Sequence, residues 1–389
     1  MRPPFTTRLR EPRPRRPAAR TAARRSFTTA CVALLALLAA CAQPAAAPRA
    51  PDAAKAPSAP PAGAAAAGAT PPQAAAASTQ PAALQPLKFV ISTISASIAP
   101  TVVAKEAGFT ARQGLDVDLV IARSGSEAMA ALLSQDAPLG SIGGNAIINA
   151  SASGADLVAV AVQQVRFTYQ VMSDPSLQTF ADLRGKRLGV ADVGGSSDLA
   201  TQYALDKFGL RRGEDVAVVA LGSQNERLGG LQAGAVAAAM LQAPFTASAR
   251  EAGYKTLFNF ANEDYEAPIT TVVTNRAYLR DHPDVVRRYV TALVDAIHYF
   301  KTERAGTLAI VGRFLGLDDP AALDEIYSES AGPVLLEAPL PRAATFASAI
   351  KDIAAHNENV ARLNPNDLVD DRFVRELMDS GYIDRLYGR

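Results

Sequence analysis

Short apolar runs alternate with small polar turns and helical patterns along the chain from about residue 87. Residues 88–91 form a compact apolar run, followed by a serine-rich turn and a periodic stretch that begins at Pro100. Residues 114–121 and 137–142 repeat this order, each followed by small polar residues and a helical stretch. Three such units in succession predict parallel strands joined by crossover helices.

The same order continues through the middle of the chain. Residues 157–162 and 168–172 predict strands, and the runs 188–191, 216–221 and 236–241 each lead into a polar turn, which predicts a second α/β lobe. The β-branched run 269–275 predicts the strand that returns the chain to the first lobe. Beyond it, apolar residues at spacings of three and four predict helices over 281–301, 306–315, 321–330, 343–357 and 370–379, which we expect to cover the first lobe.

The turn Gly194-Gly195-Ser196-Ser197 lies between a predicted strand and a predicted helix. The first turn of a helix has free backbone N–H groups and a partial positive charge. Its serines either cap the helix or donate hydroxyl groups to a ligand. Because similar turns follow the other strands, and ligands of such sheets lie at the carboxyl ends of the strands, we favour a shared cleft.

The first thirty residues hold nine arginines and one glutamate, whereas the whole chain has a net charge of +1. This basic head runs into an apolar stretch, 30–40, that is too short to span a membrane and ends just before Cys41. The order resembles a bacterial lipoprotein signal, so we expect a signal peptide over 1–40 and a lipid on Cys41. Arg24 and Arg25 also resemble a twin-arginine signal, and the export route stays open.

Residues 41–86 are rich in Ala and Pro, and we expect a disordered tether there because the segment has little apolar surface to bury. Cys41 is the only cysteine after the expected cleavage. An internal disulfide, a cysteine metal site and a thiol nucleophile are therefore excluded from the folded part. His282, His298 and His356 are expected to be surface or packing residues, and we expect neither a metal nor a cofactor.

Residues 104–109, 113–117 and 182–190 resemble the substrate-binding proteins of nitrate, sulfonate, taurine and pyrimidine uptake transporters. The chain departs from that pattern at Gly140 and Ala237, where the family usually has an acidic residue. The resemblance implies an α/β fold of the two-lobed periplasmic-binding-protein type II, with two crossover strands and extra C-terminal helices. Lobe 1 would comprise residues 87–180 and 268–389, and lobe 2 residues 181–267.

The resemblance also implies a monomeric, extracytoplasmic, lipid-anchored protein that binds a small solute and delivers it to an ABC permease and its ATPase. It implies neither catalysis nor nucleic-acid binding. We expect an anion such as a sulfonate or carboxylate. A neutral heterocycle, such as a pyrimidine or flavin precursor, and an enzyme or sensor on the same fold remain alternatives.

The candidate ligand-binding residues follow strand ends in both predicted lobes. Arg166 and Arg227 are the candidates to supply a positive charge, and Asp192 is expected to cap a turn. The other candidates are Ser95, Ser97, Ser124, Gly144 and Asn145 in the first lobe, and Gly195, Ser196, Ser197 and Asp198 in the second, with Gln242 near the hinge.

Overall fold

The computed structural model describes residues 83–92, 94–332 and 334–389. The expected signal peptide, Cys41 and almost all of the expected tether lie outside these residues. None of the helices in the described ranges is both long and apolar enough to cross a membrane.

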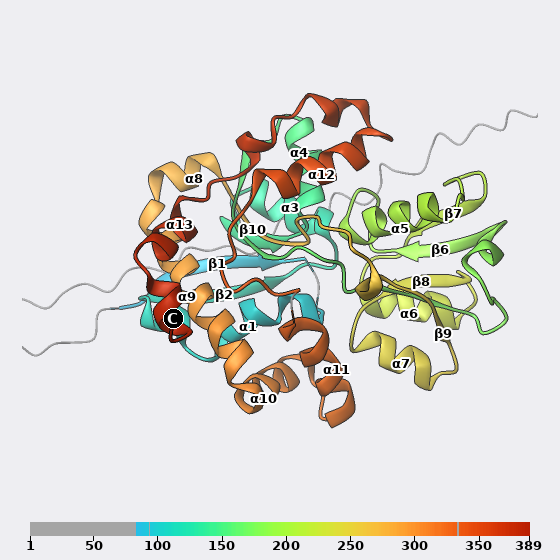
Figure 1. The fold of residues 1–389 in the computed structure, drawn as a ribbon, viewed down its shortest axis with the longest axis horizontal. Coiled ribbons are helices and arrows are strands. Elements are labelled where there is room, and N and C mark those ends of the chain that lie inside the picture. The colour runs from blue at the N-terminus through green and yellow to red at the C-terminus, as the bar shows by residue number, and fades with distance from the viewer. Residues whose placement is uncertain (1–82, 93, 333) are drawn as a thin grey trace, which may run out of the picture. The chain divides into compact units, whose positions relative to one another are not determined.

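Two five-stranded sheets form the centres of two lobes (Figure 1). In spatial order, the lobe 1 strands are β2 (Leu115–Ile121), β1 (Gln85–Ile91), β3 (Leu139–Ile142), β10 (Thr270–Asn275) and β4 (Leu157–Gln164). The lobe 2 strands are β7 (Val216–Ala220), β6 (Lys186–Val190), β8 (Ala238–Leu241), β5 (Gln170–Ser173) and β9 (Lys255–Asn259).

The predicted fold class is confirmed, including the return strand. β1 pairs in parallel with β2 and β3, and β6 pairs in parallel with β7 and β8. β10 runs antiparallel between β3 and β4, so the chain does return to the first sheet there. Each parallel part of a sheet therefore ends its strands at one common edge.

Two of the expected boundaries differ from the structure. β5, which we expected in lobe 1, pairs antiparallel with β8 and β9, so lobe 2 begins before residue 170 and not at 181. Its apolar run gives no sign of which sheet it joins, because its partners lie far along the chain. The first strand begins at Gln85 and not at Leu87, since the Gln85 N–H donates to the Gly114 carbonyl at 2.9 Å.

Helices cover both faces of each sheet (Figure 1). α1 and α9 lie on one face of the first sheet and α3, α4 and α12 on the other, while α5 faces α6 and α7 across the second sheet. The α-helices of lobe 1 are α1 (Ala99–Glu106), α2 (Phe109–Arg112), α3 (Gly125–Leu133), α4 (Gly144–Ala152), α8 (Arg276–Asp281), α9 (Pro283–Thr302), α10 (Arg304–Leu315), α11 (Pro320–Ala331), α12 (Ala343–Ala354), α13 (Arg372–Asp379) and α14 (Tyr382–Leu386). Those of lobe 2 are α5 (Ser196–Lys207), α6 (Gln224–Gln232) and α7 (Phe245–Glu251). Short 3-10 helices are η1 (Ala96–Ile98), η2 (Phe180–Leu183), η3 (Phe260–Asn262), η4 (Glu358–Arg362) and η5 (Pro365–Leu368).

The sheet of lobe 1 contributes to two apolar clusters, one of which continues into lobe 2, because successive residues of a strand point to opposite faces. Phe89 and Ile91 of β1 belong to the cluster that α1 and α9 cover, whereas Val90 belongs to the cluster on the opposite face. The Phe89 ring stacks on Tyr289 of α9 with ring centroids 4.5 Å apart. This packing holds β1 against α9 on one face of the sheet.

Candidate functional site

A cavity of about 960 Å³ lies between the two lobes. On the lobe 1 side its wall includes Ser126 and Met129 of α3, Asn145 and Asn149 of α4, and the end of α12. On the lobe 2 side it includes the loop between β6 and α5, the outer face of α5, and the turn 210–214. A cavity of this size can hold a small organic molecule.

The absence of a side chain at Gly195 leaves room for the Asp192 carboxylate in the loop after β6. A Cβ atom on Gly195 would lie 1.9 Å from the Oδ1 atom of Asp192, closer than two unbonded atoms can approach. The Asp192 Oδ2 atom accepts hydrogen bonds from the Ser126 backbone N–H at 2.8 Å and from its hydroxyl at 2.7 Å. Gly195 thus makes room for a carboxylate that joins the lobes.

A second polar contact between the lobes uses α4. The Asn145 side-chain amide donates to the Gly194 carbonyl at 2.6 Å, and the Asn149 amide donates to the same oxygen at 3.2 Å. The Ser196 hydroxyl donates to the Asn145 Oδ1 atom at 3.0 Å. A Cβ atom on Gly143 would lie 1.9 Å from the Ser196 hydroxyl oxygen, so a side chain there would displace this hydroxyl from Asn145.

Side chains in the first turn of α5 hydrogen-bond to the backbone of the loop between β6 and α5. The N-cap residue is Gly195, and neither Ser196 nor Ser197 caps the helix. The Ser197 hydroxyl accepts from the Ala191 N–H at 2.9 Å. Asp198 accepts from the Gly194 N–H at 2.8 Å and pairs with Arg212 at 2.6 Å.

Arg227 lies buried close to Asp192 and Tyr169, and its side chain is 2% exposed. Its Nη1 donates to the Gly222 carbonyl at 2.7 Å, but its Nε has no hydrogen-bond partner among the described residues. Burial lowers the pKa of this guanidinium, and the nearby Tyr169 and Asp192 act in the opposite direction. Burial also raises the pKa of Tyr169 to about 12. A buried cation with so few partners is costly, which makes Arg227 a candidate to meet an anion. Arg227 is not itself part of the cavity wall, but Asp192, which lies close to it, is.

The ionisable side chains of the cavity wall are mostly acidic. Five carboxylates line it, against two guanidiniums and one imidazole. Arg212 pairs with Asp198 as described, Arg211 pairs with Glu214 at 2.5 Å, and His356 lies 3.5 Å from Asp206. The other two acids of the wall are Asp192 and Asp352.

Only some of the predicted residues come together at this cavity. Asn145, Gly195 and Asp198 line it, and Ser196 contacts Asn145. The other candidates have different local partners. Ser95 and Ser97 share a hydrogen bond of 2.8 Å, Ser124 caps α3 by accepting from the Glu127 N–H, and the Gly144 N–H donates to the Pro268 carbonyl. Arg166 pairs with Asp264 at 2.7 Å, and Gln242 donates to the Thr168 hydroxyl at 2.6 Å.

Several wall residues were not among the candidates. Ser126 and Asn149 lie one helical turn or less from predicted residues, and the same small-polar pattern could have included them. Asp192 was expected only to cap a turn, yet its carboxylate contacts the other lobe. His356 and Asp352 reach the cavity through the placement of α12, for which the sequence carries no local signal.

The sequence model of the family described as "NMT1/THI5 like" matches residues 95–303, more than half of the chain. The chain belongs to this NMT1/THI5-like family. The matched residues contain β3, β6 and the loop of Gly194 and Gly195, so the main walls of the cavity belong to the family region. Helices α10 to α14, including α12 at the cavity, follow the matched residues.

Relatives and solved structures show further similarity in sequence and in fold. A Brucella abortus (strain 2308) protein named "Putative binding protein BAB2_1146" is 24% identical over 221 residues, which are 56% of this chain and 68% of that protein. The alkanesulfonate-binding protein SsuA from Xanthomonas axonopodis pv. citri bound to MOPS has a TM-score of 0.63 at 20% identity, covering 73% of this chain and 98% of that one. The periplasmic nitrate-binding protein NrtA from Synechocystis PCC 6803 has a TM-score of 0.63 at 13% identity, covering 76% and 89%. These structures share the fold of periplasmic binding proteins with this chain.

Proposed function

We propose that this NMT1/THI5-like chain is the solute-binding component of an ABC importer and acts outside the cytoplasm. The cavity between the lobes carries this proposal, because both lobes contribute polar groups to its wall. A solute that touches both lobes only when they are together shifts the protein toward that arrangement. The names of the sulfonate-binding and nitrate-binding structural neighbours support the same class of function.

We also propose that the protein is exported and lipid-anchored through residues 1–41, which lie outside the described residues. The basic head, the short apolar stretch and Cys41 support export and a lipid anchor, with residues 41–86 as a tether. A monomer that hands its solute to a permease and ATPase follows from the same family likeness. We propose binding and release without catalysis.

For the solute we propose a small organic anion, a carboxylate or a sulfonate. Arg227 supports this choice, because its buried guanidinium has a free Nε and no ion pair within the described part of the chain. A neutral heterocycle is the second candidate. The acidic wall favours it, because carboxylates on the wall repel an anion but accept hydrogen bonds from ring N–H groups.

A thermal-shift screen of sulfonates, carboxylates, pyrimidines and flavins tests the proposal. A ligand that binds only the folded state raises the melting temperature, by an amount equivalent to about 2.7 kcal/mol at a hundredfold excess over Kd. We expect an anion to give the largest shift. If turnover of a compound is detected and no solute changes the melting temperature, the transport function is wrong.

Arg227→Met separates the two candidate solutes. The variant should keep its structure, because Arg227 has no ion pair among the described residues and its removal also removes the cost of burying a charge with few partners. We expect it to abolish the shift from anions and to leave any shift from neutral rings. Arg166→Met is the matched control, because the Arg166 guanidinium already has an ion pair, with Asp264, and therefore does not need a bound anion.

A further inference from the structure

Helix α11 contacts both lobes with opposite faces. Toward lobe 1, the Ser330 hydroxyl donates to the Ala96 carbonyl at 3.3 Å and the Tyr327 ring stacks on Phe300 of α9 with centroids 5.5 Å apart. Lys301 of α9 also donates to the Ala331 carbonyl at the end of α11 at 3.2 Å. These contacts anchor α11 to the lobe 1 core.

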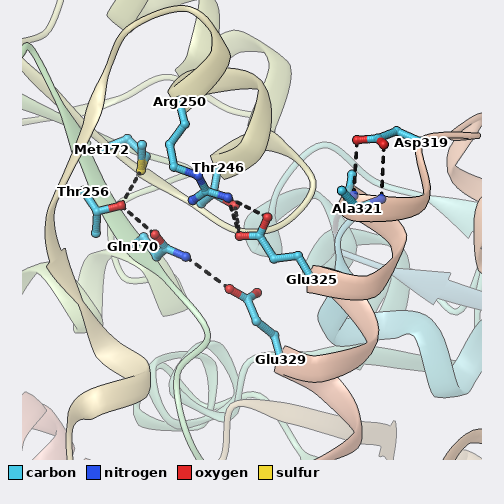
Figure 2. A network of polar contacts seen from close by, with 10 residues as sticks. Gln170, Met172, Thr246, Arg250, Thr256, Asp319, Ala321, Glu325 and Glu329 are labelled. Carbon is cyan, nitrogen blue, oxygen red and sulfur yellow. Dashed lines mark hydrogen bonds and ion pairs between the residues drawn. The ribbon is translucent and has the colours of Figure 1, made fainter.

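The other face of α11 carries two glutamates to lobe 2 (Figure 2). Glu325 accepts two hydrogen bonds from Arg250 of α7, at 2.6 and 2.7 Å, and one from the Thr246 hydroxyl at 3.3 Å. Glu329, one turn further along, accepts from the Gln170 amide of β5 at 3.1 Å. The Thr256 hydroxyl donates to the Gln170 Oε1 atom at 2.8 Å and so holds that amide in position.

We propose that α11 is a proton-dependent latch between the lobes, in which Glu329 is the positioning residue whose proton favours closure. The proposal rests on the proposed solute-binding function only where it links closure to affinity. The latch itself follows from the contacts of α11, which lies outside the residues that match the family.

The surroundings of Glu329 explain why its carboxyl group would bind a proton in the closed arrangement. Its Oε2 atom is buried and has no hydrogen-bond partner among residues 83–92, 94–332 and 334–389, so a negative charge on this carboxyl group would have no donor at that oxygen and would be costly. The groups that face it are Glu325 on its own helix, Arg250 on α7, the Gln170 amide on β5 and the Ala243 N–H before α7. Only Glu325 and Arg250 are charged, and they pair with each other.

Burial, followed by the negative charge of Glu325, raises the pKa of Glu329 from 4.5 to about 7, whereas Gln170, Arg250 and the Ala243 N–H act in the opposite direction. When the lobes separate, water reaches the carboxyl group and its pKa falls toward the ordinary value. The closed arrangement therefore binds the proton more tightly. Its advantage is full below about pH 4.5 and is lost as the pH rises through about 7.

Hydrogen exchange without any solute tests the latch directly. The Ala96 N–H donates to the Ala243 carbonyl across the lobes at 3.3 Å, so its protection reports whether the lobes are together. In the full chain, after correction for the intrinsic exchange rate, we expect this protection to fall about tenfold between about pH 6 and about pH 8, since a tenfold change corresponds to one pH unit of linkage. In Glu329→Gln the fall should vanish, because the amide cannot titrate.

Asp324→Asn is the matched control on the same helix, since Asp324 faces Arg304 at the surface, and it should keep the fall. If Glu329→Gln does not fold, Glu325→Gln replaces it, and the midpoint of the fall should move to lower pH because the repelling charge is gone. The same pH dependence in the wild type and in the folded variant would overturn the latch.

A second experiment measures solute affinity at two pH values and tests whether the latch affects the proposed function. With the solute found in the thermal-shift screen, the wild type should bind about tenfold more tightly at pH 6 than at pH 8, and Glu329→Gln should bind equally at both. A solute that binds with no pH dependence, while the exchange of Ala96 still depends on pH, would refute the link to affinity. If no solute binds at all, the solute-binding function fails, and the exchange experiment still decides on the latch.

Discussion

Gly195 determines where the Asp192 carboxylate lies, and through it how Ser126 of the other lobe is held. A methyl group on Gly195 would overlap the Oδ1 atom of Asp192 at 1.9 Å, so the carboxylate would have to move away. That movement would break the two hydrogen bonds from Ser126. One added methyl group would therefore weaken the contact between the lobes.

We expect Gly195→Ala to cost about 0.5–1.5 kcal/mol of unfolding free energy, as the loss of a hydrogen bond typically does, because the Asp192 side chain can turn aside but then loses its bonds from Ser126. Solute affinity should fall about tenfold, equivalent to about 1.4 kcal/mol, because a lost hydrogen bond to a charged group costs about that much. Urea unfolding and calorimetric titration measure the two effects. Gly229→Ala in α6 is the control: its new methyl group meets no atom within 4 Å, and the change should stabilise the helix by about 0.5–1 kcal/mol. If Gly195→Ala bound the solute with unchanged affinity, the solute would not bind at this loop.

At the scale of elements, α9 carries the core of lobe 1. Its buried face includes Tyr289 against Phe89 of β1 and Phe300 against Tyr327 of α11. Phe300 is completely buried. We expect Phe300→Ala to destabilise the protein by about 3–5 kcal/mol, because the cavity that it leaves cannot collapse fully.

Chemical unfolding of the two variants Phe300→Ala and Leu133→Ala provides the comparison. Leu133 lies on α3 with half of its side chain exposed, so its truncation should cost well under half as much. Equal losses for the two variants would mean that α9 is not the main support of the first sheet.

Most strands and helices could be predicted from local patterns, and the exceptions have physical causes. The run 283–302 has the apolar spacing of a helix with one buried face, and α9 forms there. β9 was not predicted, because Lys255–Asn259 is an edge strand of mostly half-buried residues without a clear alternation. β5 was assigned to the wrong lobe because four buried residues fit either sheet equally well.

At the scale of the whole molecule, the site depends on contacts that no local pattern encodes. The sequence predicts Asn145 and the 194–198 turn as candidate ligand-binding positions, since both follow strands. It does not predict that the Asn145 amide donates a hydrogen bond to the Gly194 carbonyl. Nor does it indicate that α12 reaches the cavity or that α11 joins the lobes. Such contacts form only after both lobes have folded.

The contact between Asn145 and Gly194 gives a prediction at this scale. Its hydrogen bonds exist only when the lobes are together, so Asn145→Ala should weaken closure while leaving each lobe intact. A typical hydrogen bond contributes about 0.5–1.5 kcal/mol, which corresponds to roughly two- to tenfold weaker solute binding. Asn366→Ala, in η5 away from the cavity wall, is the control. Small-angle scattering should show that Asn145→Ala needs more solute to reach the compact state, and equal solute requirements for the two variants would mean that this contact does not contribute to closure.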